Sequence, residues 1–276
     1  MRSLLFSLIF LVSGSTHLWS APEKIVVSTY AGDVATIDAY LFRPAGSGPF
    51  PAVVALHGCG GIFNSSGRIT PRHADWAERF LKAGYAVIFP DSFGSRGHKS
   101  LCKIKNRPVK HSHRVADLRG TADWLAGQAL IDPKRIALLG WSNGGSTLMR
   151  AVSPDQAPLN TEFVTAIAFY PSCRWALNKA MSRPRIKPII FIGAADDWTP
   201  PGPCKALAEK WDLRLVLYEG AYHGFDVPNS KVRVLKGRAY SASGDGTVHV
   251  GTNPQARLDA IKDVMAHLKD VFTAAR

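Results

Sequence analysis

The sequence predicts an α/β protein in which a mostly parallel sheet is covered by helices on both faces. Short apolar runs of strand length alternate with segments of helical periodicity along most of the chain, which is the pattern of parallel strands joined by crossover helices. Residues 52–56 are apolar at every position, as expected of a strand buried on both faces. Residues 136–139 form a similar run that breaks into Gly-x-Ser-x-Gly and continues as a helix, which indicates a sharp strand-to-helix turn.

The first 20 residues have the features of a secretory signal peptide. Arg2 provides a positive start, residues 4–12 form an apolar run, and small and polar residues precede Ala21. The apolar run is too short to cross a bilayer as a permanent helix. We therefore predict cleavage after Ser20 and a single exported domain over residues 21–276, located in the periplasm or outside the cell. An uncleaved N-terminal anchor is the alternative.

The other elements follow from periodicity and turn residues. Strands are expected at residues 24–29, 35–42, 52–56, 85–89, 136–140, 163–170, 188–192 and 213–218, the first two as an antiparallel hairpin. Helices are expected at residues 71–83, 113–130, 146–150, 203–211 and 255–272. A turn is expected at Asp132-Pro133. No regular structure is expected at residues 95–112 and 226–253, and residues 174–187 form a basic stretch to which no element is assigned.

Four cysteines, Cys59, Cys102, Cys173 and Cys204, remain after the signal peptide. An even count in an exported chain permits two disulfides, with three possible connectivities. Cys173 and Cys204 lie in loops at the same edge of the predicted sheet. We therefore predict the pairs Cys173–Cys204 and Cys59–Cys102, with free thiols or a single bridge as the alternatives.

The net charge of +13 is concentrated in three segments. Residues 99–119, 174–187 and 231–238 carry seven, five and four Lys or Arg residues, against the single acid Asp117. Each segment follows the carboxyl end of a predicted strand. We therefore expect a basic rim around one mouth, which would raise the local concentration of anionic esters. Scattered, solvated lysines are the alternative.

A serine hydroxyl becomes a nucleophile when a base takes its proton and an acid holds that base in the right tautomer. Ser142 occupies the predicted turn, and His223 follows the strand at residues 213–218. Two adjacent acids, Asp196 and Asp197, follow the strand at residues 188–192. The order Ser, Asp, His along the chain is one of the known arrangements of serine hydrolases. These residues predict a catalytic triad.

Five motifs along the chain point to one family. They are His57-Gly58-Cys59-Gly60-Gly61, Pro90-Asp91-Ser92-Phe93, Gly140-Trp141-Ser142-Asn143-Gly144, residues 193–200 and His223-Gly224-Phe225. From Val53 to the closing helix the chain resembles the dienelactone hydrolase family of the α/β-hydrolase superfamily. The resemblance implies an α/β-hydrolase fold without a large lid domain. It also implies an acid four residues before a proline, so Pro200 selects Asp196 over Asp197.

The chain also departs from the founding members of this family. Those resemble Gly-x-Cys-x-Gly enzymes with a glutamate after the third strand, whereas this chain carries Ser142 and His57-Gly58. The family's carboxylate-binding arginine is matched only approximately, by Arg96. The resemblance therefore implies a serine carboxylesterase, with dienelactone itself a doubtful substrate.

The turn at Ser142 also predicts which backbone groups stabilise the oxyanion that forms during the reaction. An oxyanion hole needs one backbone N–H after the nucleophile and one from an earlier loop, which would come from Asn143 and Cys59. Trp141, Trp175 and Trp198 lie beside motifs or sheet edges and are candidates for an acyl pocket, although ordinary packing would place them there as well.

We conclude from the sequence that the protein is an exported serine hydrolase that cleaves carboxylic esters, small or anionic, through an acyl-enzyme. A polyester hydrolase, a peptidase and a non-catalytic binder of anionic surfaces are the alternatives. We predict no cofactor and no metal site, and we expect His111 and His113 to be a solvated pair. The expected partner is a small-molecule ester, with no nucleic acid and no membrane span. The oligomeric state stays open.

Overall fold

The computed structural model describes residues 21–156, 159–178 and 182–275. The predicted signal peptide, residues 1–20, lies outside the described residues, so its cleavage stays a prediction. No helix among the described residues combines the length and the apolar character needed to cross a membrane.

The centre of the molecule is an eight-stranded sheet with the order β1-β2-β4-β3-β5-β6-β7-β8. The strands are β1 Glu23–Ser28, β2 Thr36–Phe42, β3 Phe50–Leu56, β4 Ala86–Pro90, β5 Ile131–Trp141, β6 Thr165–Phe169, β7 Pro188–Gly193 and β8 Leu215–Tyr218. β1 and β2 form the predicted antiparallel hairpin, and β2 pairs antiparallel with β4. All later pairings are parallel. The carboxyl ends of β5, β7 and β8 therefore meet at one edge.

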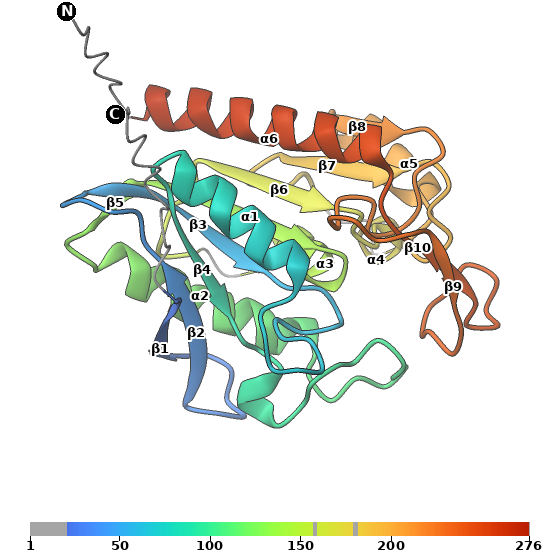
Figure 1. The fold of residues 1–276 in the computed structure, drawn as a ribbon, viewed down its shortest axis with the longest axis horizontal. Coiled ribbons are helices and arrows are strands. Elements are labelled where there is room, and N and C mark those ends of the chain that lie inside the picture. Colours follow the sequence, from blue (N-terminus) through green and yellow to red (C-terminus); the bar gives the residue numbers. More distant parts are fainter. Residues whose placement is uncertain (1–20, 157–158, 179–181, 276) are drawn as a thin grey trace, which may run out of the picture.

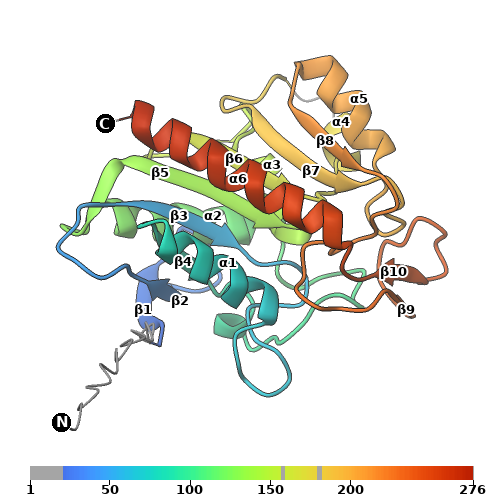
Figure 2. The same ribbon diagram turned by 45° about the horizontal axis from the view of Figure 1, so that its top comes forward.

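Helices cover both faces of this sheet, as the sequence predicts. They are α1 Pro71–Lys82, α2 His111–Ala126, α3 Asn143–Ala151, α4 Arg174–Asn178, α5 Gly202–Trp211 and α6 Pro254–Ala274. Both views show α1 and α6 in front of the sheet, with α2 and α3 behind it (Figures 1 and 2). Strands enclosed in this way must be apolar on both sides. Accordingly, β4, β6 and β7 are buried at every position.

The closing helix α6 shows how the sequence fixes such an element. The side chain of Asn253 accepts a hydrogen bond from the Ala256 N–H and caps the first turn. Small and apolar residues then recur every fourth position, which places them on one face of the helix. These buried residues are Ala256, Ala260, Val264, Leu268 and Phe272.

Two local predictions were wrong, and one short helix was not predicted. Asp132-Pro133 does not end an element, because β5 begins at Ile131 and a bulge opposite β3 absorbs both residues. The segment 174–187 contains the short helix α4. The loop 226–253 contains a two-stranded sheet of β9 Arg233–Leu235 and β10 Val248–Val250, which lies beyond the arrowheads of the central strands (Figure 1).

Candidate active site

Ser142 lies on a strained turn between β5 and α3. Its backbone has φ 52° and ψ −114°, in a region that non-glycine residues avoid. The two flanking glycines make the turn possible. A Cβ on Gly144 would lie 2.0 Å from the Leu56 carbonyl oxygen, and one on Gly140 would lie 2.6 Å from the Gly144 backbone. The predicted strand–turn–helix geometry is therefore present, with the serine at its apex.

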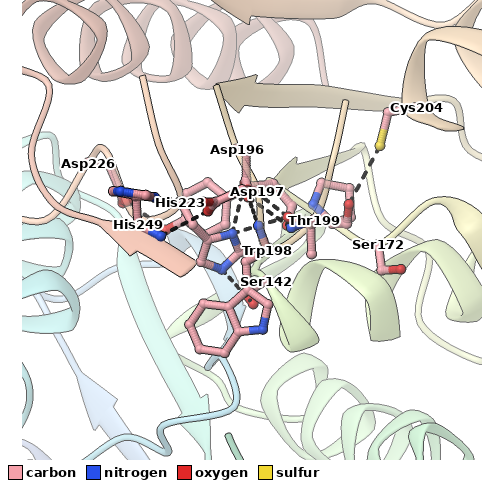
Figure 3. Close-up of polar contacts among 12 residues, drawn as sticks. Ser142, Ser172, Asp196, Asp197, Trp198, Thr199, Cys204, His223, Asp226 and His249 are labelled. Carbon is pink, nitrogen blue, oxygen red and sulfur yellow. Dashed lines mark hydrogen bonds and ion pairs between the residues drawn. The ribbon is translucent and has the colours of Figure 1, made fainter. Parts of the chain in front are cut away.

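His223 joins Ser142 to Asp196. Its Nε2 lies 2.9 Å from the Ser142 Oγ, and its Nδ1 lies 2.8 Å from an Asp196 carboxylate oxygen. The imidazole lies between the other two side chains (Figure 3). Asp196 and His223 are only 3% and 4% exposed, so their hydrogen bond is shielded from water. The three residues come from the loops after β5, β7 and β8.

The Asp196 carboxylate is held by more than the histidine. One oxygen accepts the backbone N–H groups of Trp198 and Thr199, at 2.9 and 2.8 Å. The other accepts the Thr199 hydroxyl at 2.9 Å. This arrangement fixes which oxygen faces His223. The role of Thr199 was missed at the sequence level, although an Asp followed three residues later by Thr is a common local turn.

Asp197 points to a different histidine. Its carboxylate accepts the backbone N–H of His249 at 2.9 Å and lies 2.7 Å from the Nδ1 of the same residue. Figure 3 shows Asp197 and His249 facing each other beside the Asp196–His223 pair. Because His249 belongs to β10, this contact fastens the 226–253 segment to the site. Of the two adjacent acids, Asp196 is therefore the one that contacts His223.

A cavity of about 390 Å³ opens at Ser142. Cys59 and Asn143, the predicted oxyanion residues, both line it. Trp175 and Trp198 line it as well. These four placements agree with the sequence-based expectation that the residues share one pocket, and their roles in binding or catalysis stay predictions.

Two of the predicted substrate-binding residues lie elsewhere. Trp141 is completely buried, and its indole N–H donates to the carboxylate of Asp226 at 2.9 Å. The guanidinium of Arg96 bonds Asp33 and Asp117 and has a side chain only 6% exposed. Neither residue is among the described residues that line the cavity. Both were placed in the pocket by sequence proximity to a motif, and both instead satisfy buried carboxylates.

Asp226 lies beneath the turn in a buried polar cluster that sequence reasoning missed. Its carboxylate accepts the indole N–H groups of Trp76 and Trp141 and the hydroxyl of Tyr170 at 2.6 Å. Arg72 lies 3.3 Å away and provides the countercharge. The Tyr170 ring in turn contacts the His223 ring, with centroids 4.5 Å apart. The cluster therefore ties the loop that carries His223 to the strand that carries Ser142.

Arg114 joins the two segments that would form the oxyanion hole. It projects from α2, is 1% exposed, and donates to the carbonyl oxygen of His57 at 2.7 Å and to the side-chain oxygen of Asn143. Its guanidinium also lies 5.0 Å from the centre of the Phe93 ring. Burial lowers the pKa of Arg114 to about 9, against the partly compensating charge of Asp117. Such a buried cation is costly to hold unless it has well-placed acceptors.

Both predicted disulfides are present. Cys59–Cys102 and Cys173–Cys204 have Cα separations of 4.9 and 5.1 Å. Cys59 and Cys173 line the cavity. The first bridge therefore fastens the basic segment around Cys102 to the cavity wall, and the backbone bond from the Leu101 N–H to the Cys59 carbonyl, at 2.8 Å, supports it.

Cations gather at the cavity, as two of the three basic segments predict. The residues are Lys105, Arg107, Lys110, Arg150 and Arg174, and no Asp or Glu is among the described residues that line the cavity. The third segment, residues 231–238, does not reach it, although Tyr240 just beyond does. The prediction of a solvated pair was wrong, because both histidines are only partly exposed. His113 Nδ1 lies 3.3 Å from a carboxylate oxygen of Asp33, and His111 lines the cavity.

Comparisons with known proteins agree with the fold. Residues 37–272 match the dienelactone hydrolase family. A provisionally named dienelactone hydrolase from Klebsiella pneumoniae subsp. pneumoniae superposes with a TM-score of 0.62 at 16% identity, covering 90% of this chain and 99% of that one. Esterase 2 of Thermogutta terrifontis gives 0.59 at 21% identity, with coverages of 90% and 93%. Dipeptidyl peptidase 4 of Porphyromonas gingivalis gives 0.56 at 17% identity, with coverages of 74% and 33%.

These neighbours share the mostly parallel sheet and its helices, and at such identities they speak for the fold alone. The family match spans the strands and loops that carry all three residues of the Ser142 site. The chain belongs to the dienelactone hydrolase family.

Proposed function

We propose that this protein is an exported serine carboxylesterase that works through an acyl-enzyme. The observation that carries the proposal is the unbroken hydrogen-bond chain from Ser142 through His223 to Asp196, at a strained turn that opens into a cavity. A hydroxyl, a base and an orienting acid in that geometry form a catalytic triad, which can carry out nucleophilic acyl transfer.

The proposed reaction has two steps. The Ser142 Oγ attacks the ester carbonyl while His223 Nε2 takes its proton, and the N–H groups of Cys59 and Asn143 hold the resulting oxyanion. The C–O bond to the alcohol then breaks, and His223 returns the proton to the departing oxygen. A water molecule, activated by His223, hydrolyses the acyl-serine and releases the acid. Asp196 accepts the His223 Nδ1–H and so holds the imidazole in the tautomer that can take the proton of Ser142.

Export is part of the proposal. Two disulfides, at Cys59–Cys102 and Cys173–Cys204, persist in oxidising compartments and are rare in the reducing cytosol. The first 20 residues have the composition of a signal peptide. We infer that the remaining chain acts as a single domain in the periplasm or outside the cell.

The reaction class can be tested by trapping the intermediate. We expect 4-nitrophenyl butyrate and phenyl butyrate, hydrolysed in the presence of hydroxylamine, to give hydroxamate and butyrate in the same ratio, because both pass through one butyryl-Ser142. We expect the matching 4-nitroanilide to react far more slowly, which would separate an esterase from a peptidase. Hydroxamate ratios that differ between the two esters would argue for direct attack by water instead.

Replacing Arg114 tests how the oxyanion hole is built. In Arg114→Met the carbonyl of His57 and the side-chain amide of Asn143 lose their shared donor. The two segments that carry the Cys59 and Asn143 N–H groups are then no longer joined, so these groups lose their alignment. Loss of a single oxyanion donor costs about 10²–10³-fold in kcat. Misalignment of the two N–H groups should lower kcat by an amount near the lower end of that range and leave KM nearly unchanged. The affinity for a trifluoromethyl ketone, which forms an oxyanion on Ser142, should fall in parallel.

Arg96→Met is the matched control. It also removes a buried arginine, but one that bonds Asp33 and Asp117 away from the cavity. We expect it to lower the melting temperature, because it leaves a buried carboxylate without its partner, while kcat per folded molecule stays near wild type. A fall in kcat of equal size in both variants would show that Arg114 acts through general stability.

A further inference from the structure

The cations at the cavity lie together in a pocket whose described lining contains no carboxylate. Some arginines elsewhere, such as Arg72, Arg79 and Arg257, lie in ion pairs. Within the described part of the chain, none of the five cavity cations forms an ion pair. Like charges gathered without counterions repel one another. An anion that enters the cavity would relieve that repulsion.

Two of these cations, Arg107 and Arg150, line the cavity together with His111. Burial is the main cause that lowers the pKa of His111, and the charges of Arg150, Arg114 and Arg107 lower it further. The His111 Nδ1 lies 2.8 Å from the hydroxyl of Thr147, one turn before Arg150 on the same face of α3. The two arginines therefore reach one cavity from different segments of the chain, Arg107 from the segment before α2 and Arg150 from α3.

Both guanidinium groups are held by aromatic rings instead of carboxylates. The guanidinium carbon of Arg150 lies 3.6 Å from the centre of the Trp175 ring, and that of Arg107 lies 5.0 Å from the Tyr240 ring. A guanidinium that lies over an aromatic face keeps its in-plane N–H groups available to donate. The Nε–H of Arg107 already donates to the carbonyl oxygen of Leu101 at 3.1 Å, so its terminal N–H groups are the ones available. Burial lowers the pKa of Arg150 to about 10 and that of Arg107 in the same direction. Both groups nonetheless remain charged at neutral pH.

The position of Arg150 on α3 determines how far a bound anion would lie from the ester carbonyl. Arg150 comes seven residues after Asn143, so the helical rise places its Cα about 10 Å further along the axis of α3. Its side chain leans back toward the start of the helix. An anion at Arg150 would therefore lie several bonds away from an ester carbonyl at Ser142, and not next to it.

We propose that Arg107 and Arg150, with Trp175 as a wall, form an anion subsite that selects esters with a carboxylate several bonds from the scissile carbonyl. The inference rests on the proposed esterase function. It does not use the position at which the chain approximates the family's carboxylate-binding arginine, because Arg96 there is occupied by Asp33 and Asp117. The subsite cations come instead from the segment before α2 and from the end of α3.

The test compares matched anionic and neutral esters. One pair is mono-4-nitrophenyl adipate and its methyl-capped diester, with the charge on the acyl side. The other is 4-carboxyphenyl butyrate and its methyl ester, with the charge on the alcohol side. We expect kcat/KM to favour the anionic member of at least one pair by about tenfold or more, as close charge pairs do. The preference should shrink as ionic strength rises from about 0.05 to 0.5 M.

The variants assign that preference to the subsite. Arg150→Met and Arg107→Met should each reduce the anionic-to-neutral ratio by about tenfold. Lys134→Met, which removes an exposed charge near the start of β5, should leave the ratio unchanged. Equal rates within both pairs, or a preference that survives both arginine substitutions, would overturn the subsite while leaving the esterase proposal intact. No Ser142-dependent hydrolysis of any of the four esters would overturn the esterase proposal itself.

Discussion

Ser142→Ala should reduce kcat for ester hydrolysis to that of a protein that binds the ester but has no nucleophile. Loss of the nucleophile or of the base in a serine hydrolase costs about 10⁶-fold in kcat, and His223→Ala should fall equally far because the hydroxyl and the imidazole act as one unit. Among the described residues, the hydroxyl of Ser142 forms a hydrogen bond only with His223. Its removal should therefore leave the melting temperature nearly unchanged. Initial rates with 4-nitrophenyl butyrate and a thermal melt measure both quantities.

Ser172→Ala is the matched control for this experiment. Ser172 also lines the cavity, but its side chain is exposed and the bond it makes to Ser146 comes from its backbone N–H. Wild-type rates are expected for this variant. If Ser142→Ala retained more than a few per cent of the wild-type rate, another group would have to be the nucleophile.

Asp196→Asn should cost about 10⁴-fold in kcat, the size of effect seen when the triad acid of a serine protease becomes an amide. The reason lies in how the carboxylate is held. One oxygen accepts two backbone N–H groups, so the carbonyl oxygen of an asparagine must take that position. Its NH₂ group must then face the Nδ1 of His223. That contact favours the tautomer with hydrogen on Nε2, which cannot accept the proton of Ser142.

Asp197→Asn is the adjacent test of the same assignment. Its carboxylate contacts His249 on β10 and not His223, so we expect less than a tenfold change in kcat. A small loss of stability is expected as well, because the charged hydrogen bond to His249 becomes a neutral one. Comparable losses of kcat in both variants would mean that the two acids act together.

The parts of the site that the sequence predicted are those encoded locally. Gly140 and Gly144 mark the turn because no other residue fits there, and strand ends in a parallel sheet meet at one edge, which brings Asp196 and His223 to Ser142. The same edge predicted the disulfide Cys173–Cys204, and Cys59–Cys102 was the pair that remained.

The parts that could not be predicted depend on partners distant in sequence. Arg114 bonds His57 from 57 residues away, and Arg96 bonds Asp33 from 63 residues away. No local pattern distinguishes such buried arginines from solvated ones, and one of them was therefore assigned to the substrate pocket. β9 and β10 have three residues each, which is too short to show the alternation by which a strand is recognised.

The central claim is that Ser142 is the nucleophile, and a covalent adduct tests it most directly. Paraoxon transfers its diethylphosphoryl group to an activated serine hydroxyl and releases 4-nitrophenolate, so it is a suitable probe. Wild-type protein should gain one diethylphosphoryl group per chain, located by peptide mass spectrometry on Ser142, and Ser142→Ala should gain none. An adduct on another residue, or active protein that hydrolyses esters but takes up no phosphoryl group, would contradict the account.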